Sequence, residues 1–148
     1  MLAKIKFSDG SSAGAVNPDQ IVNVSHWTEI QNGRNVRIGT FINLVNGKTV
    51  NIKLPVDEVI DMINEGATPQ SRLVTLTGCL GNDMGVDPSL VKTVVWNSDA
   101  GSIRVELVDG FKLGVKGPES RIGEVIAKLN REEIEINMPL SMGRTLEI

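Results

Sequence analysis

One pattern of apolar and turn residues occurs twice along this chain, and no other feature of the sequence constrains its fold as strongly. The first copy is Val16, Pro18, Ile21 and Val24, and the second, with identical spacing, is Val86, Pro88, Val91 and Val94. A tryptophan closes each segment, Trp27 in the first half and Trp96 in the second. This ordered series of matches predicts an internal repeat of one supersecondary unit.

Hairpin turns and helical stripes recur in the same order. Asn46-Gly47 and Asp109-Gly110 are typical of tight hairpin turns, and each glycine is followed 8 positions later by a proline, Pro55 or Pro118. After each proline comes a stripe of four apolar residues with the spacing of one face of an α-helix. The stripes are Val56, Val59, Ile60 and Ile63, and then Ile122, Val125, Ile126 and Leu129.

These patterns predict a β-rich α+β fold of two tandem ββββα units, residues 1–66 and 72–130. Antiparallel sheets backed by one helix each are expected, followed by a C-terminal strand and extension over residues 131–148. One unit of this size buries its helix and sheet face poorly. We therefore expect the two units to pack about a pseudo-twofold and to share one core.

The first unit's middle hairpin is longer than its counterpart and is the first candidate binding element. Trp27 to Ile42 spans 15 positions, whereas Trp96 to Val105 spans 9. The excess forms an arm whose polar residues are Gln31, Asn32, Arg34, Asn35 and Arg37. Two arginines among neutral amides can bind phosphate or carboxylate groups bidentately. The alternative is a solvated hairpin extension without a binding role.

The C-terminal extension is the second candidate. Glu133 to Met138 alternates and predicts a strand that pairs within the chain or with a neighbouring subunit. Beyond it, the apolar residues Leu140, Met142, Leu146 and Ile148 are expected to make assembly contacts. The tryptophans permit two interpretations: paired core anchors, which we favour, or platforms that stack on a ligand.

Catalytic chemistry finds little support in the sequence. His26 is the only histidine and Cys79 the only cysteine, so we expect a structural histidine and a small packing cysteine rather than a metal site or a nucleophile. The glycine-rich run from Gly78 to Gly85 precedes a strand and lacks the Lys-Ser/Thr ending of a phosphate-binding loop. We expect no enzyme activity, no metal and no cofactor.

Residues 4–63 resemble the small FlbD-type proteins of bacterial flagellar operons. The similarity rests on Asn17-Pro18-Asp19, on Asn46-Gly47-Lys48 and on Asp57-Glu58-Val59-Ile60. The second half matches more loosely, through Asp87-Pro88, Asp109-Gly110 and Glu124-Val125-Ile126. This resemblance implies a fold and no enzyme activity, because its motifs are turn and core positions. Repeated strands followed by a helix are also similar to PUR/Whirly-type single-strand nucleic-acid binders.

The sequence thus favours a self-associating binding or assembly module, such as a phage or bacterial structural accessory protein that is capsid-associated. It would reside in the cytoplasm or, if phage-encoded, in the virion, with protein partners and no membrane. The alternative is binding of single-stranded nucleic acid or a nucleotide through Arg34, Arg37, Arg104 and Trp96. A net charge of −3 and an aromatic content of 3% weigh against that alternative.

Overall fold

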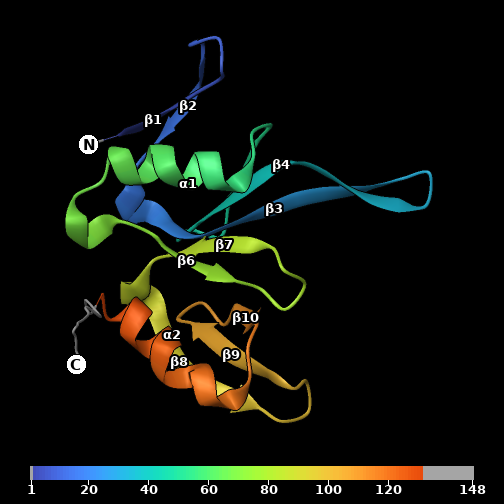
Figure 1. Ribbon diagram of the computed structural model, residues 1–148. Helices are drawn as coiled ribbons and strands as arrows, with labels where there is room; N and C mark the ends of the chain where they lie inside the picture. Colours follow the sequence, from blue (N-terminus) through green and yellow to red (C-terminus); the bar gives the residue numbers. More distant parts are fainter. Residues whose placement is uncertain (1, 132–148) are drawn as a thin grey trace, which may run out of the picture.

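The computed structural model describes residues 2–131, a predominantly β chain with two α-helices in that range (Figure 1). The first half contains β1 (Ala3–Lys6), β2 (Ser12–Val16), β3 (Ile21–Gln31), β4 (Arg34–Leu44), β5 (Thr49–Ile52) and α1 (Val56–Glu65). The second half contains β6 (Val74–Thr77), β7 (Asp83–Val86), β8 (Val91–Asn97), β9 (Ser102–Leu107), β10 (Lys112–Val115) and α2 (Ile122–Leu129). Short 3₁₀ turns lie at Pro18–Gln20, Pro69–Ser71, Pro88–Leu90 and Glu119–Arg121.

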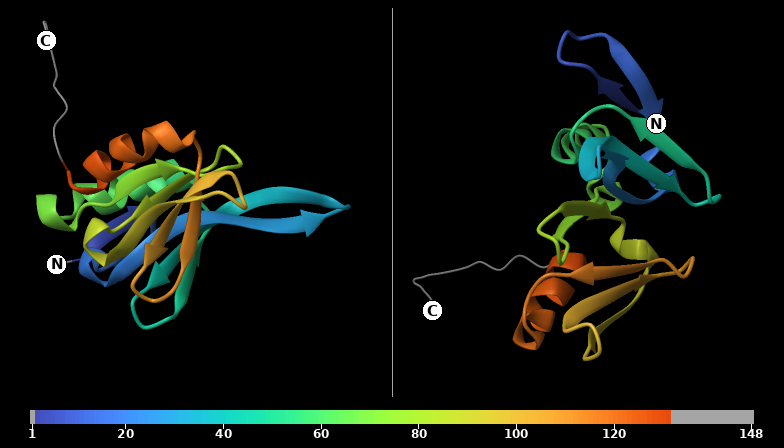
Figure 2. Two further views of the ribbon diagram at one scale, coloured as in Figure 1. Left: turned by 90° about the horizontal axis from the view of Figure 1, so that it is seen from below. Right: turned by 90° about the vertical axis from the view of Figure 1, so that its right-hand side faces the viewer.

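The strands form three antiparallel sheets. The five-stranded sheet has the order β5-β4-β3-β7-β6, the three-stranded sheet the order β10-β9-β8, and β1 pairs with β2 alone. A single bridge between Gly78 and Val115 links β6 to β10, and the Lys116 amide donates to the Thr77 carbonyl at 2.8 Å. Both helices lie on one side of these sheets (Figure 2).

The predicted ββββα units are wrong. Five strands precede each helix within the described range, and they are distributed over three sheets rather than two. In the second half the additional strand is β7, whose first three residues belong to the glycine-rich run from Gly78 to Gly85. Glycine depresses strand propensity locally, but pairing with β3 and β6 stabilises β7.

The predicted pseudo-twofold is also wrong. A twofold axis would bring equivalent strands of the two halves together. Instead β3 of the first half pairs with β7, the second strand of the second half, through Asn23↔Val86 and Val24↔Gly85. The halves are therefore joined through non-equivalent strands.

Buried apolar residues form two clusters rather than one. The first includes Ala3, Ile5, Val24 and the whole α1 stripe, so the helix prediction for residues 56–63 is confirmed. The second cluster is built from β6, β7, β9, β10 and α2, and it also contains Val22 from β3. The first half thus contributes one side chain to the second half's core.

Local chemistry matches closely between the halves. Asn17 and Asp87 each precede a proline 3₁₀ turn and accept a hydrogen bond from the amide two residues later. In each half the strand that follows carries a bulge at its second residue, Val22 in β3 and Lys92 in β8. β3 and β8 therefore occupy corresponding places, as do β2 and β7, which lead into the two turns.

Candidate binding surface

The β3–β4 arm is a continuous hairpin that projects from the body (Figure 1). Its strands pair as far as Gln31↔Arg34, so the arm ends in a two-residue turn. Asn32 and Gly33 occupy it with φ of 53° and 75°, the positive values that a type I′ turn requires. The five polar arm residues from Gln31 to Arg37 are all exposed, and Ile30 beside them is 77% exposed.

The arm does not bring its two arginines together. Arg34 pairs with Gln31 and Arg37 with Thr28 in regular register. Strand residues three positions apart point to opposite faces, so Arg34 and Arg37 lie on opposite sides of the hairpin. The two guanidinium groups therefore cannot bind one anion together on a single face of the hairpin.

Arg37 instead lies beside a pocket at the base of the arm. The pocket has a volume of about 270 Å³, and its lining includes His26, Arg37, Lys53 and Asp57. Burial lowers the pKa of His26 from its ordinary 6.5, and the positive charge of Arg37 lowers it further. His26 therefore favours its neutral form. The pocket is basic through Arg37 and Lys53, and the carboxylate of Asp57 offsets part of that positive charge.

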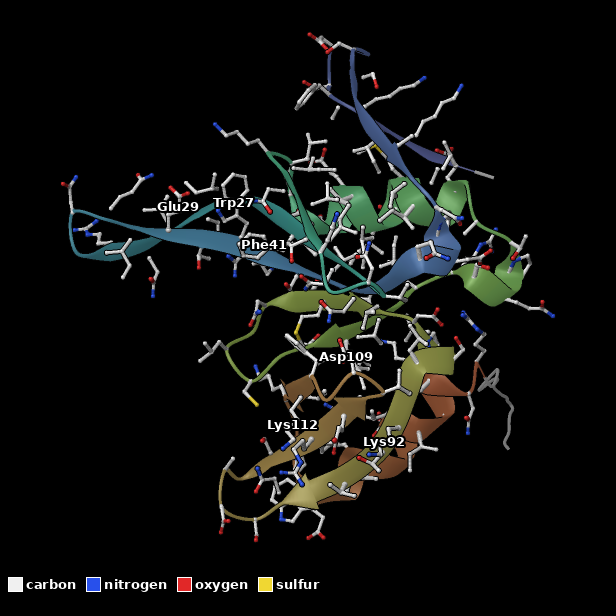
Figure 3. The ribbon with its side chains drawn as sticks, turned by 180° about the vertical axis from the view of Figure 1, so that it is seen from behind. Trp27, Glu29, Phe41, Lys92, Asp109 and Lys112 are labelled. Carbon is white, nitrogen blue, oxygen red and sulfur yellow. The ribbon has the colours of Figure 1, made fainter. Side chains whose placement is uncertain are left out.

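The sheet face opposite α1 carries an aromatic pair and a row of amides. The rings of Trp27 and Phe41 stack with centroids 5.9 Å apart and an interplanar angle of 26° (Figure 3). Beside Phe41 lies a groove of about 550 Å³. The residues that line it are Ser25, Phe41, Asn43, Thr49, Asn51 and Phe111.

A chain of hydrogen bonds fixes the amides at the groove. Thr49 Oγ1 donates to Asn43 Oδ1 at 2.8 Å, and Asn43 Nδ2 donates to Asn23 Oδ1 at 2.7 Å. Asn23 is 1% exposed, and its Nδ2 has no hydrogen-bond partner among residues 2–131. The groove therefore combines rigid aromatic rings with oriented polar groups, as ligand-binding surfaces do.

The two tryptophans lie on opposite faces of their sheets. Trp96 packs against the second core cluster, as the core-anchor interpretation predicted, whereas Trp27 stacks on Phe41 and belongs to neither cluster. By the spacing of 70 that relates Val24 to Val94, Trp96 corresponds to His26 and Trp27 to Asn97. A shift of one residue along a strand reverses the face of the side chain, so the tryptophans are not paired anchors.

Arg104 is not part of the arm surface. It pairs with Val95, next to the Trp96↔Ile103 pair, so it lies on the other face of the sheet from Trp96. Its Nε is buried, with no hydrogen-bond partner in the part of the chain that the structure describes. Trp96, Arg104 and the arm arginines are thus distributed over separate surfaces.

Several other predictions bear on this surface. The predicted C-terminal elements lie outside the described residues; they are the strand from Glu133 to Met138 and the assembly residues Leu140, Met142, Leu146 and Ile148.

Cys79 is exposed, so its prediction as a packing residue is wrong. Within residues 2–131 no three His, Cys, Asp or Glu side chains are grouped so as to hold a metal ion, and no helix has the length and apolarity to cross a membrane.

Sequence reasoning missed Phe41, Phe111 and the amide row. The alternation around Ile42 could have indicated that Phe41 and Asn43 share the face opposite the core. Nothing local places Phe111 beside them, because it comes from the turn between β9 and β10 in the other half. No protein-family model, no curated protein and no solved structure matches this chain, so its function must be argued from this geometry.

Proposed function

We propose that the protein is a non-enzymatic assembly module that associates with copies of itself. The observation that carries this proposal is that two strand edges are not covered by any strand within residues 2–131. β8 ends the three-stranded sheet, and β2 belongs to a sheet of only two strands. The β1–β2 hairpin packs on α1 through Ala3 and Ile5, but an open strand edge is still a template for pairing with another chain.

Exposed apolar side chains accompany these edges and support the same proposal. Leu2 beside β1 is 60% exposed, Val95 in β8 is 39% exposed, and Ile126 in α2 is 39% exposed. Large apolar residues that are scattered singly need no explanation. These three, however, lie next to the β1–β2 hairpin, in β8 and in α2, close to the two open strand edges. Burial of such residues in a neighbouring molecule would stabilise an assembly.

Multi-angle light scattering of the full chain, over a concentration series, tests this function. We expect the weight-average mass to rise with concentration above that of the 16.0 kDa chain. A mass that stays monomeric up to the solubility limit would refute self-association.

In this proposal the β3–β4 arm binds a second protein, to which the assembly attaches. A shortened variant without Ile30, Gln31, Arg34 and Asn35 keeps the Asn32-Gly33 turn and makes Glu29↔Val36 the flanking pair. Because two pairs are removed, the alternation of hydrogen-bonded pairs is preserved. We expect this variant to self-associate like the wild type and to lose binding of the second protein. We propose that this assembly is located in the cytoplasm or, if the protein is phage-encoded, in the virion.

The Trp27–Phe41 pair favours a second candidate, binding of single-stranded nucleic acid by stacking. Each stacked base contributes about 1–3 kcal/mol in proteins that bind this way. A fluorescently labelled oligonucleotide at low salt tests it, with Trp27→Ala as the variant and Trp96→Phe as the control. Binding that is lost in the first protein and kept in the second supports the candidate. No anisotropy change with the wild type would remove it.

A further inference from the structure

The contact between the two halves is head to tail, which means that it can be repeated. In that contact β3 pairs with β7, with Val24 opposite Gly85, and the Asp87 amide donates to the Val22 carbonyl at 3.2 Å. β8 corresponds to β3 and β2 corresponds to β7. Within residues 2–131, β8 therefore leaves open the edge that β3 uses to pair with β7, and β2 leaves open the edge that β7 uses to pair with β3.

Side chains at the junction show what a repeat of the contact would bury. Ile60 of α1 is 3% exposed. Gly85 lies against it so closely that an added Cβ would stand 3.0 Å from Ile60 Cγ1 and 3.2 Å from Leu73 Cδ1. Gly85 and Leu73, which belong to the segment that forms β6 and β7, therefore cover this face of α1.

The counterparts of these three residues are all exposed. Ile126 is the third residue of its helical stripe, as Ile60 is of the first, and it is 39% exposed. Leu2 immediately precedes β1, as Leu73 precedes β6, and it is 60% exposed. Ala15 stands next to Val16 at the end of β2, as Gly85 stands next to Val86 at the end of β7, and it too is exposed. The two surfaces of this interface thus occur again, one on α2 of the second half and the other on the β1–β2 hairpin of the first half.

We infer that these pieces meet between molecules: β8 of one copy pairs with β2 of the next in the arrangement of β3 with β7. Thr93 then lies opposite Val16 of the neighbour and Val94 opposite Ala15, while Leu2 and Ala15 cover Ile126. The inference rests on the proposed self-association and names its geometry. Because the two surfaces differ, each added copy leaves one edge free, and the assembly grows into a ring or a filament.

Three positions distinguish the two contacts, because Lys92, Ala15 and Gly14 correspond to Val22, Gly85 and Met84. Ala15 brings to Ile126 the Cβ that would crowd Ile60 at Gly85, which weakens the contact between molecules. Val22, buried in the second core cluster, corresponds to Lys92, which is exposed (Figure 3). An edge lysine weakens strand pairing, so the contact between molecules is weaker than the one within the chain. On the receiving hairpin, Met84 corresponds to Gly14, where an added Cβ would meet nothing within 4 Å. That space accommodates the longer lysine stem.

Disulfide trapping tests the geometry in the full chain. In a Cys79→Ser background, one protein carries Ala15→Cys and another carries Ile126→Cys. The short distance between Gly85 and Ile60 at the internal junction places the corresponding thiols within disulfide reach. We expect a disulfide-linked heterodimer when the two proteins are mixed and oxidised. The matched control replaces Ile126→Cys with Val45→Cys, a position that is 46% exposed and lies outside the inferred contact.

The outcomes separate the inference from the proposed function. Equal cross-linking with the Val45 control, or none with either, in a protein whose scattering mass rises with concentration, overturns this geometry and leaves self-association standing. A monomeric wild type refutes both. Protection of the Ile126→Cys thiol from maleimide in dilute monomer would show that the same chain covers this face, and it would also overturn the inference.

Two further variants give opposite shifts. Lys92→Val restores the residue type of the internal junction and is expected to lower the concentration for half-assembly roughly tenfold. Leu2→Asp places a charge in the contact and is expected to raise it by a similar factor, whereas Leu80→Asp, at a position that is 92% exposed in a distant turn, should have no effect. Identical assembly by all three variants would contradict the inferred interface.

Discussion

Trp27 stacks on Phe41 across β3 and β4, on the sheet face that no helix covers. The two strands that carry these rings continue outward as the projecting arm, so the pair lies at the arm's base. An aromatic pair of this kind contributes about 0.5–1.5 kcal/mol beyond its burial. The pair therefore anchors the arm to the body on the sheet face opposite α1.

Replacing the two tryptophans should have unequal effects. Trp96→Ala removes a side chain that packs on the second core cluster, and we expect a loss of about 3 kcal/mol in the free energy of unfolding. Trp27→Ala removes the stacking with Phe41 but no core contact, and we expect a loss of about 1 kcal/mol, which is less than half of the loss in Trp96→Ala. Urea unfolding of both variants measures the difference. Equal losses would mean that both rings are core anchors after all.

Gly85 lies so close to the first half's core that an added side chain would crowd Ile60 and Leu73. Gly85→Ala places a Cβ 3.0 Å from Ile60, and we expect a cost of about 1–3 kcal/mol from overpacking. Gly123 in α2 is the matched control, since an added Cβ there meets nothing within 4 Å. Gly123→Ala should stabilise the protein by about 0.5–1 kcal/mol. Thermal unfolding should give shifts of opposite sign, and a neutral Gly85→Ala would argue against the close junction.

The buried hydroxyl of Thr40 holds β4 to the segment before α1. Thr40 is 0% exposed, and its Oγ1 donates to the Leu54 carbonyl at 2.6 Å. Thr40→Val keeps the shape but removes the donor, and we expect a loss of about 1–2 kcal/mol in the free energy of unfolding. Thr28→Val, in the exposed arm, serves as the control and should change it by no more than about 0.5 kcal/mol.

His26 should make the protein less stable as the pH falls. Burial and Arg37 lower its folded pKa below the ordinary 6.5, so the unfolded chain binds the proton more readily than the folded one. The histidine's contribution is fully present above pH 6.5 and is lost as the pH falls below it. The free energy of unfolding between pH 7.5 and 5 should therefore fall less steeply in His26→Gln than in the wild type. Parallel pH profiles for the two proteins would refute this.

Much of the local structure follows from short segments of sequence. The Asn46-Gly47 and Asp109-Gly110 pairs indicated hairpin turns, and the stripe from Val56 to Ile63 predicted a helix whose four apolar residues are buried. Such features depend on residues within one or two turns of each other, where backbone conformation and side-chain period decide the outcome. The long arm was also predictable, because it is an insertion relative to the other half.

Tertiary structure alone decided how the halves meet and which faces stay open. The pairing of Val24 with Gly85 joins residues 61 positions apart, and no local preference selects that partner over another open edge. The same holds for Trp27 and Trp96, since a shift of one residue relative to the shared pattern placed one ring in the core and the other outside it. Sequence by itself determined the turns, the helices and the strand-rich character. Long-range strand pairing, whose free energy depends on burial across the whole sheet, determined the sheets, the separate cores and the free edges.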